Sequence, residues 1–230
     1  MVPAEPPVTE RVDWQNERVF GINKLAGHAA YMPYRNEAAV RADKARWDKP
    51  WNDPVGADWL TLNGSWKFKY VARVEERPLD FFETDYDVSA WDNITVPGCI
   101  EMQGYDRPMY VNVDYAFNDT PPYTNIKVDP SLTGPSPVGS YRRTFTLPEG
   151  WGGRRTILHF DGIYSGAYVW VNGEKVGYTQ GGNMDAEFDL TPYVKSGENS
   201  IAVQVFRWTD GSYLEGQDMF HMSGIHRDVY

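Results

Sequence analysis

From about Leu60 onward, hydrophobic and polar positions alternate in short runs, whereas earlier positions show no sustained alternation. A period of two is typical of a β-strand with one buried face. A helical period is almost absent from this part of the chain. The pattern therefore predicts an all-β domain, with strands over residues 66–70, 141–147, 156–160 and 201–206.

Residues 167–178 contain two β-rich runs on either side of Asn172-Gly173. An Asn-Gly pair tolerates the positive φ angles of a type I′ turn, so this stretch predicts a β-hairpin. A second turn signal at residues 196–199 precedes the strand predicted over 201–206. Short strands at regular spacing predict an antiparallel jelly-roll β-sandwich, which we place at residues 59–230.

The first 58 residues contain prolines at positions 3, 6, 7, 33, 50 and 54. This composition predicts a mostly irregular, extended N-terminal arm over residues 1–58, with one or two helical turns around residues 36–46. A second irregular segment, roughly residues 92–137, is rich in Pro, Gly, Asn and Tyr. Ordered loops of this length usually carry function or cover a neighbouring domain.

Composition narrows the function classes. The chain has 230 residues, with 22 basic against 32 acidic side chains and a net charge of −10, which disfavours a nucleic-acid partner. Its single cysteine, Cys99, excludes an internal disulfide framework and a cysteine-based zinc site. No apolar run approaches the roughly 20 residues that span a bilayer. We expect a soluble protein without a membrane partner, and the sequence does not encode its compartment.

Three carboxylates follow the strand predicted over 201–206, namely Asp210, Glu215 and Asp218. The end of a strand is where a β scaffold displays a polar site. Spacing within a loop does not fix the separation of two carboxylates, and structural or solvated carboxylates are commoner than catalytic ones. The pattern therefore disfavours a self-contained hydrolase. The chain stops at Tyr230 on what reads as the start of another strand, so we expect it to be one piece of a longer protein.

Asn112 lies in a short apolar run within the long irregular segment. Its amide offers both donors and an acceptor, which is the chemistry needed to bind a vicinal diol. From spacing alone, the commoner role of such an asparagine is to satisfy loop backbone. The alternating aromatics Trp66 and Trp170 are interpreted as sandwich core rather than as sugar-stacking platforms.

Long motifs run in order along almost the whole chain: Asn23–His28, Leu62–Phe68, Met109–Val113, Phe160–Ser165, Trp170–Tyr178 and Arg207–Val229. Together they resemble the N-terminal region of bacterial β-galactosidases of glycoside hydrolase family 2. The resemblance implies a galactose-binding-like jelly roll that is the first of several domains. It also implies that an immunoglobulin-like domain and a catalytic (β/α)8 barrel follow in the parent chain.

The resemblance implies a retaining hydrolysis, which needs two carboxyl groups about 5–5.5 Å apart. In the family both lie in the barrel, so this chain is expected to contain no catalytic residue and to be inactive alone. The asparagine of the Tyr-x-Asn-Val motif falls on Asn112, which is expected to hydrogen-bond galactosyl hydroxyls. The aspartate of the Trp-x-Asp-Gly-Ser-Tyr motif falls on Asp210, which is expected to contact the sugar and a bound Na⁺. The resemblance allows Mg²⁺ in the parent enzyme, without a site here.

The partners implied by the resemblance are a galactoside substrate, the catalytic barrel of the same parent chain and further copies of that chain in a homo-oligomer. Two other functions stay open from the sequence. One is a free-standing carbohydrate-binding module, and the other is a structural domain whose arm and long loop mediate subunit contacts. Some members of the family act on β-glucuronides or β-mannosides instead.

Overall fold

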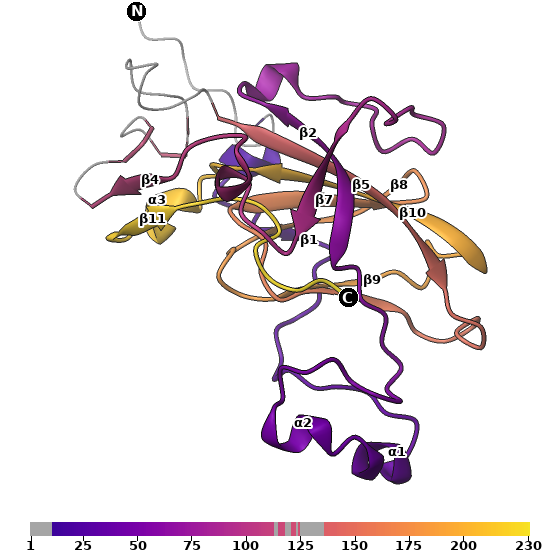
Figure 1. Cartoon of the computed structure of the whole chain (residues 1–230). Coiled ribbons are helices and arrows are strands. Elements are labelled where there is room, and N and C mark those ends of the chain that lie inside the picture. Colours follow the sequence, from indigo (N-terminus) through magenta and orange to yellow (C-terminus); the bar gives the residue numbers. More distant parts are fainter. Residues whose placement is uncertain (1–10, 113–114, 118–120, 123, 125–135) are drawn as a thin grey trace, which may run out of the picture.

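The computed structural model describes residues 11–112, 115–117, 121–122, 124 and 136–230. Seven strands form one large sheet in the order β1-β8-β7-β10-β5-β2-β3, and every neighbouring pair is antiparallel (Figure 1). The strands are β1 Gly21–Ile22, β2 Gly64–Val71, β3 Asp92–Val96, β5 Val138–Leu147, β7 Gly166–Val171, β8 Glu174–Gln180 and β10 Gly197–Phe206.

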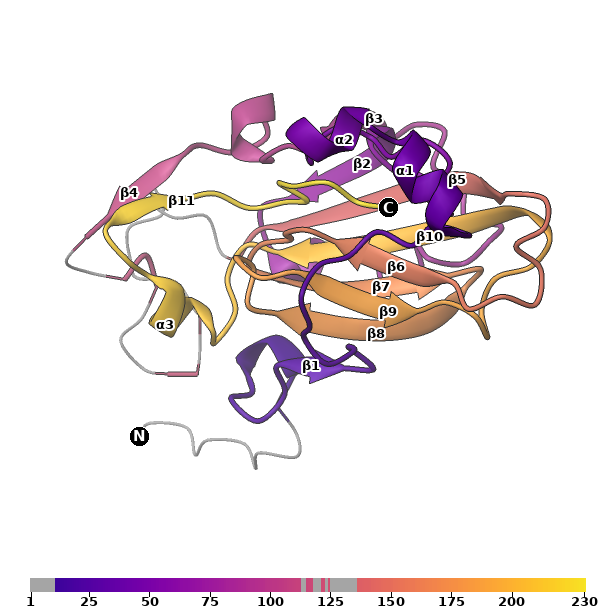
Figure 2. The ribbon, with the colours of Figure 1, turned by 90° about the horizontal axis from the view of Figure 1, so that it is seen from below.

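A smaller layer covers one face of the large sheet (Figure 2). It consists of β6 (Ile157–Phe160) paired with β9 (Ala186–Asp189). The last residues of the chain extend this layer, because Val229 bridges Phe160 and the amide of His159 donates to the carbonyl oxygen of Tyr230 at 2.8 Å. A separate two-stranded ribbon, β4 (Met109–Val111) with β11 (Met219–His221), lies at one end of the molecule.

The main core lies between the large sheet and the smaller layer. Alternate residues of β10, such as Val203 and Val205, point into this core and are fully buried, together with Phe160 and Phe188 of the smaller layer. The opposite face of the large sheet is covered too, by a second cluster that includes the following residues: Trp14, Phe81, Tyr168, Trp170, Tyr178 and Phe206. The all-β sandwich is thus confirmed, and both faces of its principal sheet are buried.

The predicted core aromatics are confirmed, since Trp66 is 1% and Trp170 is 8% exposed. The hairpin is confirmed as well. Strands β7 and β8 are joined by Asn172 and Gly173 with φ angles of 52° and 87°, as a type I′ turn requires. Strand β10 begins earlier than the pattern predicts, at Gly197, because its first residues already pair with the end of β5.

The arm contains helices α1 (Glu37–Ala42) and α2 (Ala45–Asp48), where helical turns were predicted. Asn36 caps α1, accepting a hydrogen bond from the amide of Ala39 at 3.0 Å. Strand β1 was not predicted, because two residues are too few to show a period of two. It joins the arm to the large sheet through β8. The division between arm and domain at residues 58 and 59 stays a prediction.

The segment predicted to be irregular over residues 92–137 begins with strand β3 and contains β4. Strand β3 pairs only with β2 and lies at the edge of the sheet, so its polar Asp-Asn start does not have to be buried. Residues 113–114, 118–120, 123 and 125–135 of this segment lie outside the described part. The other helical elements of the described residues are short: α3 Ser212–Glu215 and the 3₁₀ turns Asp13–Gln15, Val74–Glu76 and Glu101–Gln103.

A substitution at Gly177 of β8 tests how closely strand β1 of the arm packs against the large sheet. A Cβ atom there would lie 2.2 Å from the carbonyl oxygen of Ile22 and 2.7 Å from Cε1 of Phe188. We expect Gly177→Ala to displace β1 and to lower the free energy of unfolding by about 1–3 kcal/mol, measured by urea denaturation. The matched control is Gly27→Ala, where no other described part of the chain lies within 4 Å of the added Cβ. Equal stability of the two variants would contradict the tight β1–β8 contact.

Candidate functional site

The polar loop that follows β10 and the β4–β11 ribbon lie at the same end of the sandwich (Figures 1 and 2). This arrangement depends on Arg207, the first residue after β10, whose side chain is 3% exposed. Its Nη2 donates to the carbonyl oxygens of Arg107 and His221, each at 3.1 Å, and its Nη1 pairs with the Asp106 carboxylate. One buried cation therefore joins the end of β10 to both sides of the ribbon.

A second buried charge supports the same arrangement. Glu101 is 4% exposed, and its Oε1 lies 3.5 Å from Nε of Arg207. The carboxylate also accepts hydrogen bonds from the amide of Ser223 at 2.8 Å and from its hydroxyl at 2.7 Å. A buried carboxylate is tolerated when it is paired and hydrogen-bonded in this way. Glu101, which precedes β4, and Ser223, which follows β11, are consequently held together beside Arg207.

Asn112 directly follows β4, and its side chain is exposed. It lines a pocket of about 130 Å³ together with Tyr115, Trp208, Ser212 and His221. The ribbon therefore presents the amide beside residues of the loop that follows β10. Sequence reasoning singled out Asn112 without being able to show this neighbourhood.

Asp210 is half-buried, in the turn that follows Trp208. Its Oδ1 accepts a hydrogen bond from Nε2 of Gln180 at 2.8 Å, and its amide donates to the carbonyl oxygen of Trp14 at 2.9 Å. Burial raises the pKa of the Asp210 carboxyl, and the hydrogen bond from Gln180 partly offsets this effect. The carboxylate is therefore held in one orientation by a neutral donor.

Asp210 and Asn112 are brought to the same end of the domain but do not line one pocket. Trp208 and Ser212, on either side of Asp210 in the sequence, line the pocket of Asn112. Asp210 itself is directed toward Gln180. The structure thus places the two predicted side chains at one end of the domain but in different surroundings.

Three buried hydroxyl groups fix the turn that carries Asp210. The Oγ of Ser165 lies 2.8 Å from Oγ1 of Thr209 and 2.9 Å from Oγ of Ser212. The amide of Thr209 also donates to Oγ of Ser212 at 3.1 Å. Because all three residues are buried, the turn is built on the sandwich rather than being an unsupported loop.

The family model described as "Glycosyl hydrolases family 2, sugar binding domain" matches residues 60–230. The chain belongs to this family. Over nearly its whole length, this family 2 chain is 40% identical to a β-galactosidase of Priestia megaterium, covering 97% of the chain and 21% of that protein. It is 39% identical to a β-galactosidase of Psychromonas ingrahamii, covering 94% and 19%. The chain therefore spans about one fifth of the length of these relatives.

Solved structures of two glycosidases are similar to the chain. A β-glucuronidase of Bacteroides uniformis has a TM-score of 0.53 and 27% identity, covering 74% of the chain and 17% of that protein. A β-glycosidase of Bacteroides vulgatus has a TM-score of 0.52 and 26% identity, covering 74% and 19%. The predicted relationship to family 2 is confirmed.

The other carboxylates of this family 2 domain's loop have separate surroundings. Asp218 accepts a hydrogen bond from the hydroxyl of Tyr110. The pKa of Glu215 is raised, because the effect of burial exceeds the lowering effect of a backbone hydrogen bond from Gly182. Within the described residues, the contacts of Asp210, Glu215 and Asp218 therefore differ.

A sodium ion would find only part of a coordination shell at Asp210. Carboxylate oxygens are hard ligands of the kind that Na⁺ takes, and Gln180 keeps this carboxylate oriented. In the part of the chain that the structure describes, no group of three or more His, Cys, Asp or Glu side chains is placed to hold a metal ion. Asp210 thus offers one oriented carboxylate as a possible oxygen ligand.

Two structural features of the site were missed at the sequence level. Gln180 lies two residues after Tyr178 on β8, so the period of two places both side chains on one face of the strand. Nothing in the sequence indicates that Gln180 donates a hydrogen bond to Asp210. Trp14 comes from the arm, nearly 200 residues away in sequence.

No helix in the described part of the chain is long and apolar enough to cross a membrane.

The role of Gln180 can be measured directly. Gln180→Met removes the donor to Asp210 while keeping the side-chain length, so we expect the pKa of Asp210 to rise further, measured by carbon-detected NMR of the carboxyl group. Gln204→Met is the matched control, because this buried glutamine donates to Pro78 and Ser140 instead. The assignment fails if both variants leave the Asp210 titration unchanged.

Proposed function

We propose that this chain is the N-terminal sugar-binding domain of a β-galactosidase-type glycoside hydrolase and lends polar contacts to its galactose subsite. The observation that carries the proposal is the placement of an exposed amide and an oriented carboxylate, Asn112 and Asp210, at one end of the sandwich. An amide can donate to one sugar hydroxyl and accept from the next, and a carboxylate accepts from a hydroxyl. Curated relatives at about 40% identity that are named β-galactosidases favour a terminal β-galactoside as substrate.

The parent protein would perform a retaining hydrolysis with two carboxyl groups of a catalytic barrel. This chain would supply neither of them and would be inactive alone. Its part in the reaction would be to orient the galactosyl group and to hold Asp210 as one Na⁺ ligand, with the remaining ligands in the barrel. Bound Na⁺ would supply a positive charge beside the sugar oxygens. Mg²⁺ in the parent enzyme would have no ligand here.

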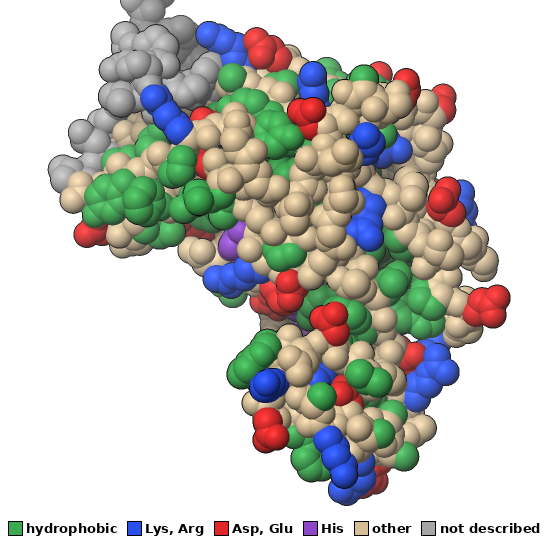
Figure 3. Space-filling model, in the orientation of Figure 1, with side chains coloured by type: hydrophobic (Ala, Val, Ile, Leu, Met, Phe, Trp, Pro, Cys, Tyr) green, Lys and Arg blue, Asp and Glu red, His purple; other side chains and the backbone are tan. Residues whose placement is uncertain are grey.

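An exposed apolar patch supports a contact with the catalytic domain. Figure 3 shows apolar side chains gathered at the end of the molecule that carries the β4–β11 ribbon. Tyr110 and Phe220 on this ribbon are 51% and 54% exposed. Exposed apolar clusters next to polar groups often mark protein contacts.

The parent is also proposed to assemble as a homo-oligomer, with the arm contributing to subunit contacts.

Substitution in the full-length parent tests the subsite. Asn112→Ala and Asp210→Ala would each remove a contact to hydroxyls near the reacting carbon, contacts that can strengthen in the oxocarbenium-like transition state. We expect kcat to fall and KM to rise with a galactoside substrate, with kcat/KM reduced by about 10-fold or more. A rise in KM at unchanged kcat would mean that the contacts serve ground-state binding only.

The isolated chain should bind galactose weakly, because half of its proposed subsite lies elsewhere. We expect calorimetric titration in Na⁺ and in K⁺ buffer to give a dissociation constant above about 1 mM in both. Submillimolar binding that is lost in Asp210→Asn would instead identify a self-sufficient carbohydrate-binding module.

A further inference from the structure

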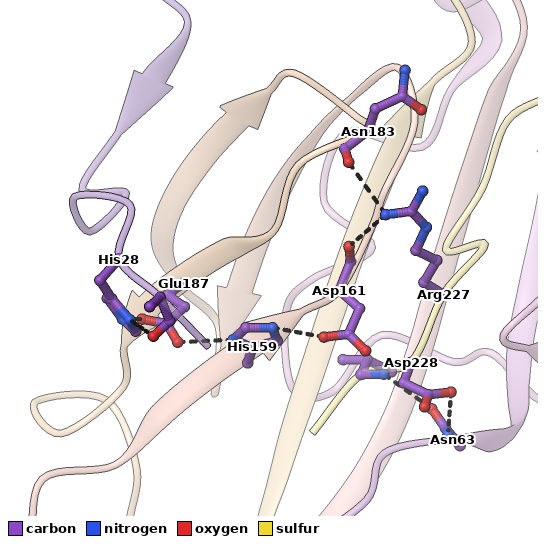
Figure 4. A network of polar contacts seen from close by, with 10 residues as sticks. His28, Asn63, His159, Asp161, Asn183, Glu187, Arg227 and Asp228 are labelled. Carbon is purple, nitrogen blue, oxygen red and sulfur yellow. Dashed lines mark hydrogen bonds and ion pairs between the residues drawn. The ribbon is translucent and has the colours of Figure 1, made fainter. Parts of the chain in front are cut away.

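A line of four ionisable side chains joins the arm to the smaller layer of the sandwich, away from the proposed sugar site (Figure 4). His28 of the arm approaches Oε2 of Glu187 with its Nε2 at 2.7 Å. The other oxygen of Glu187 lies 2.8 Å from Nδ1 of His159, and Nε2 of His159 lies 2.8 Å from Oδ1 of Asp161. We call His28, Glu187, His159 and Asp161 the latch.

The partners of His159 indicate its protonation state. Both of its ring nitrogens face carboxylate oxygens, which can only accept when ionised. A neutral imidazole has a single N–H and would leave one of these contacts without a proton. Since His159 is 5% exposed, water cannot readily replace the missing donor. The geometry is complete only when His159 is an imidazolium ion.

The same argument applies to His28. Its Nδ1 lies 2.9 Å from the carbonyl oxygen of Ala29, and its Nε2 faces Glu187. Both neighbours are acceptors, so the two contacts are hydrogen bonds at the same time only when this exposed ring carries two protons. Glu187 thus lies between two imidazolium ions, one on the arm and one on β6.

The pKa directions agree with this geometry. The backbone hydrogen bond to Ala29 and then the Glu187 carboxylate raise the pKa of His28. Burial lowers the pKa of His159, but hydrogen bonds to Asp161 and Glu187 outweigh it, and the net shift is upward. Burial raises the pKa of Glu187, and the two imidazoles reverse this effect, so that its pKa is lowered.

Other charged and aromatic groups lie next to the latch. Arg155 pairs with Asp189 at 2.8 Å, and Nη1 of Arg227 donates to the carbonyl oxygens of Asn183 at 3.2 Å and of Asp161 at 3.5 Å. Tyr230 stacks on His159 with ring centroids 4.6 Å apart, and Tyr31 lies 5.3 Å from His28. Asp185 acts electrostatically on His28 and on Tyr230, and Arg46 acts on Tyr230.

We propose that the latch is a pH-sensitive fastening that holds the arm on the β6–β9 layer while its two histidines are protonated and releases the arm when they lose their protons. Deprotonation leaves each ring with a single N–H, so that His28 and His159 each lose one hydrogen bond and no longer carry the positive charge that compensates Asp161 and Glu187. The arm is then attached here mainly by backbone contacts, such as the hydrogen bond from the amide of Leu25 to the carbonyl oxygen of Glu187 at 2.9 Å.

Release of the latch would also open a hollow of the molecule. His159 and Glu187 line a pocket of about 240 Å³ whose other walls include Tyr31 and Asp58 of the arm together with Trp59 and Tyr230. The arm forms one side of this pocket and the sandwich forms the other. The latch would therefore control the width of this hollow independently of the proposed galactose subsite.

The direction of the pH effect follows from the raised pKa values of the histidines. A group whose pKa is higher in the folded state stabilises that state fully below its ordinary value of about 6.5. This stabilisation is lost as the pH rises through the folded-state value. We therefore expect the arm to be fastened below about pH 6.5 and to loosen as the pH rises through the raised folded-state values of the two histidines.

The test combines two measurements on the 230-residue chain. Long-range ¹⁵N NMR should show both imidazoles doubly protonated at pH values where free histidine is half neutral, about 6.5. Hydrogen exchange, corrected for the intrinsic rate, should show that protection of the Leu25 amide falls by roughly tenfold per unit of raised pKa as the pH rises. The amide of Asn172 in the β7–β8 hairpin, which donates to Ser200, is the internal reference and should not respond.

Substitutions of the exposed His28 separate charge from packing. His28→Gln should lose the pH dependence and show low Leu25 protection throughout. His28→Lys keeps a positive charge to about pH 10 and should retain more protection than His28→Gln in alkaline solution. The proposal is overturned if either wild-type imidazole titrates at or below about 6.5, or if the lysine and glutamine variants lose protection equally. The NMR titration needs no variant at the buried His159, so a folding defect there cannot obscure the result.

Discussion

The structure depends on β10, which is hydrogen-bonded along both edges. It pairs with β5 over its entire length from Gly197 to Phe206 and with β7 over its second half. Its alternate side chains enter the cores on the two faces of the large sheet. Such a strand cannot shift by one residue without exchanging the two sets of side chains. The loop that follows is therefore delivered to a fixed position, and with it Arg207 and Asp210.

Much of the fold could be predicted from the sequence, because β2, β5, β6, β7, β8 and β10 leave a period-two or turn signal. The type I′ hairpin at Asn172-Gly173 is the clearest case, since only a few residue types tolerate both φ angles. Strands β1 and β3 leave no such signal. The first is two residues long, and the second is a polar edge strand. Their pairing depends on neighbours distant in sequence, which local patterns do not encode.

The site was predictable as a set of residues but not as an arrangement. Resemblance singled out Asn112 and Asp210, whereas their supports come from distant segments. Arg207 is joined to residues about 100 positions earlier, and Gln180 reaches Asp210 across the sheet. In the sequence, Arg207 cannot be distinguished from a surface arginine, because its burial and its paired carboxylates are visible only in the structure. Its importance follows only from its burial, because an unpaired charge there would be strongly unfavourable.

Two partly buried carboxylates, Glu187 and Asp210, have pKa values that are shifted in opposite directions. Glu187 lies between two imidazoles, which lower its pKa and compensate its charge, so it can serve as a structural joint. Asp210 has a neutral amide as its side-chain donor, and burial raises its pKa. Its charge therefore stays uncompensated within the described residues that contact it. A carboxylate held in place but left without a cation is suited to accept a sugar hydroxyl or to bind a metal ion when the remaining ligands approach. The difference between the two sites lies in the charge of the donor rather than in the carboxylate itself.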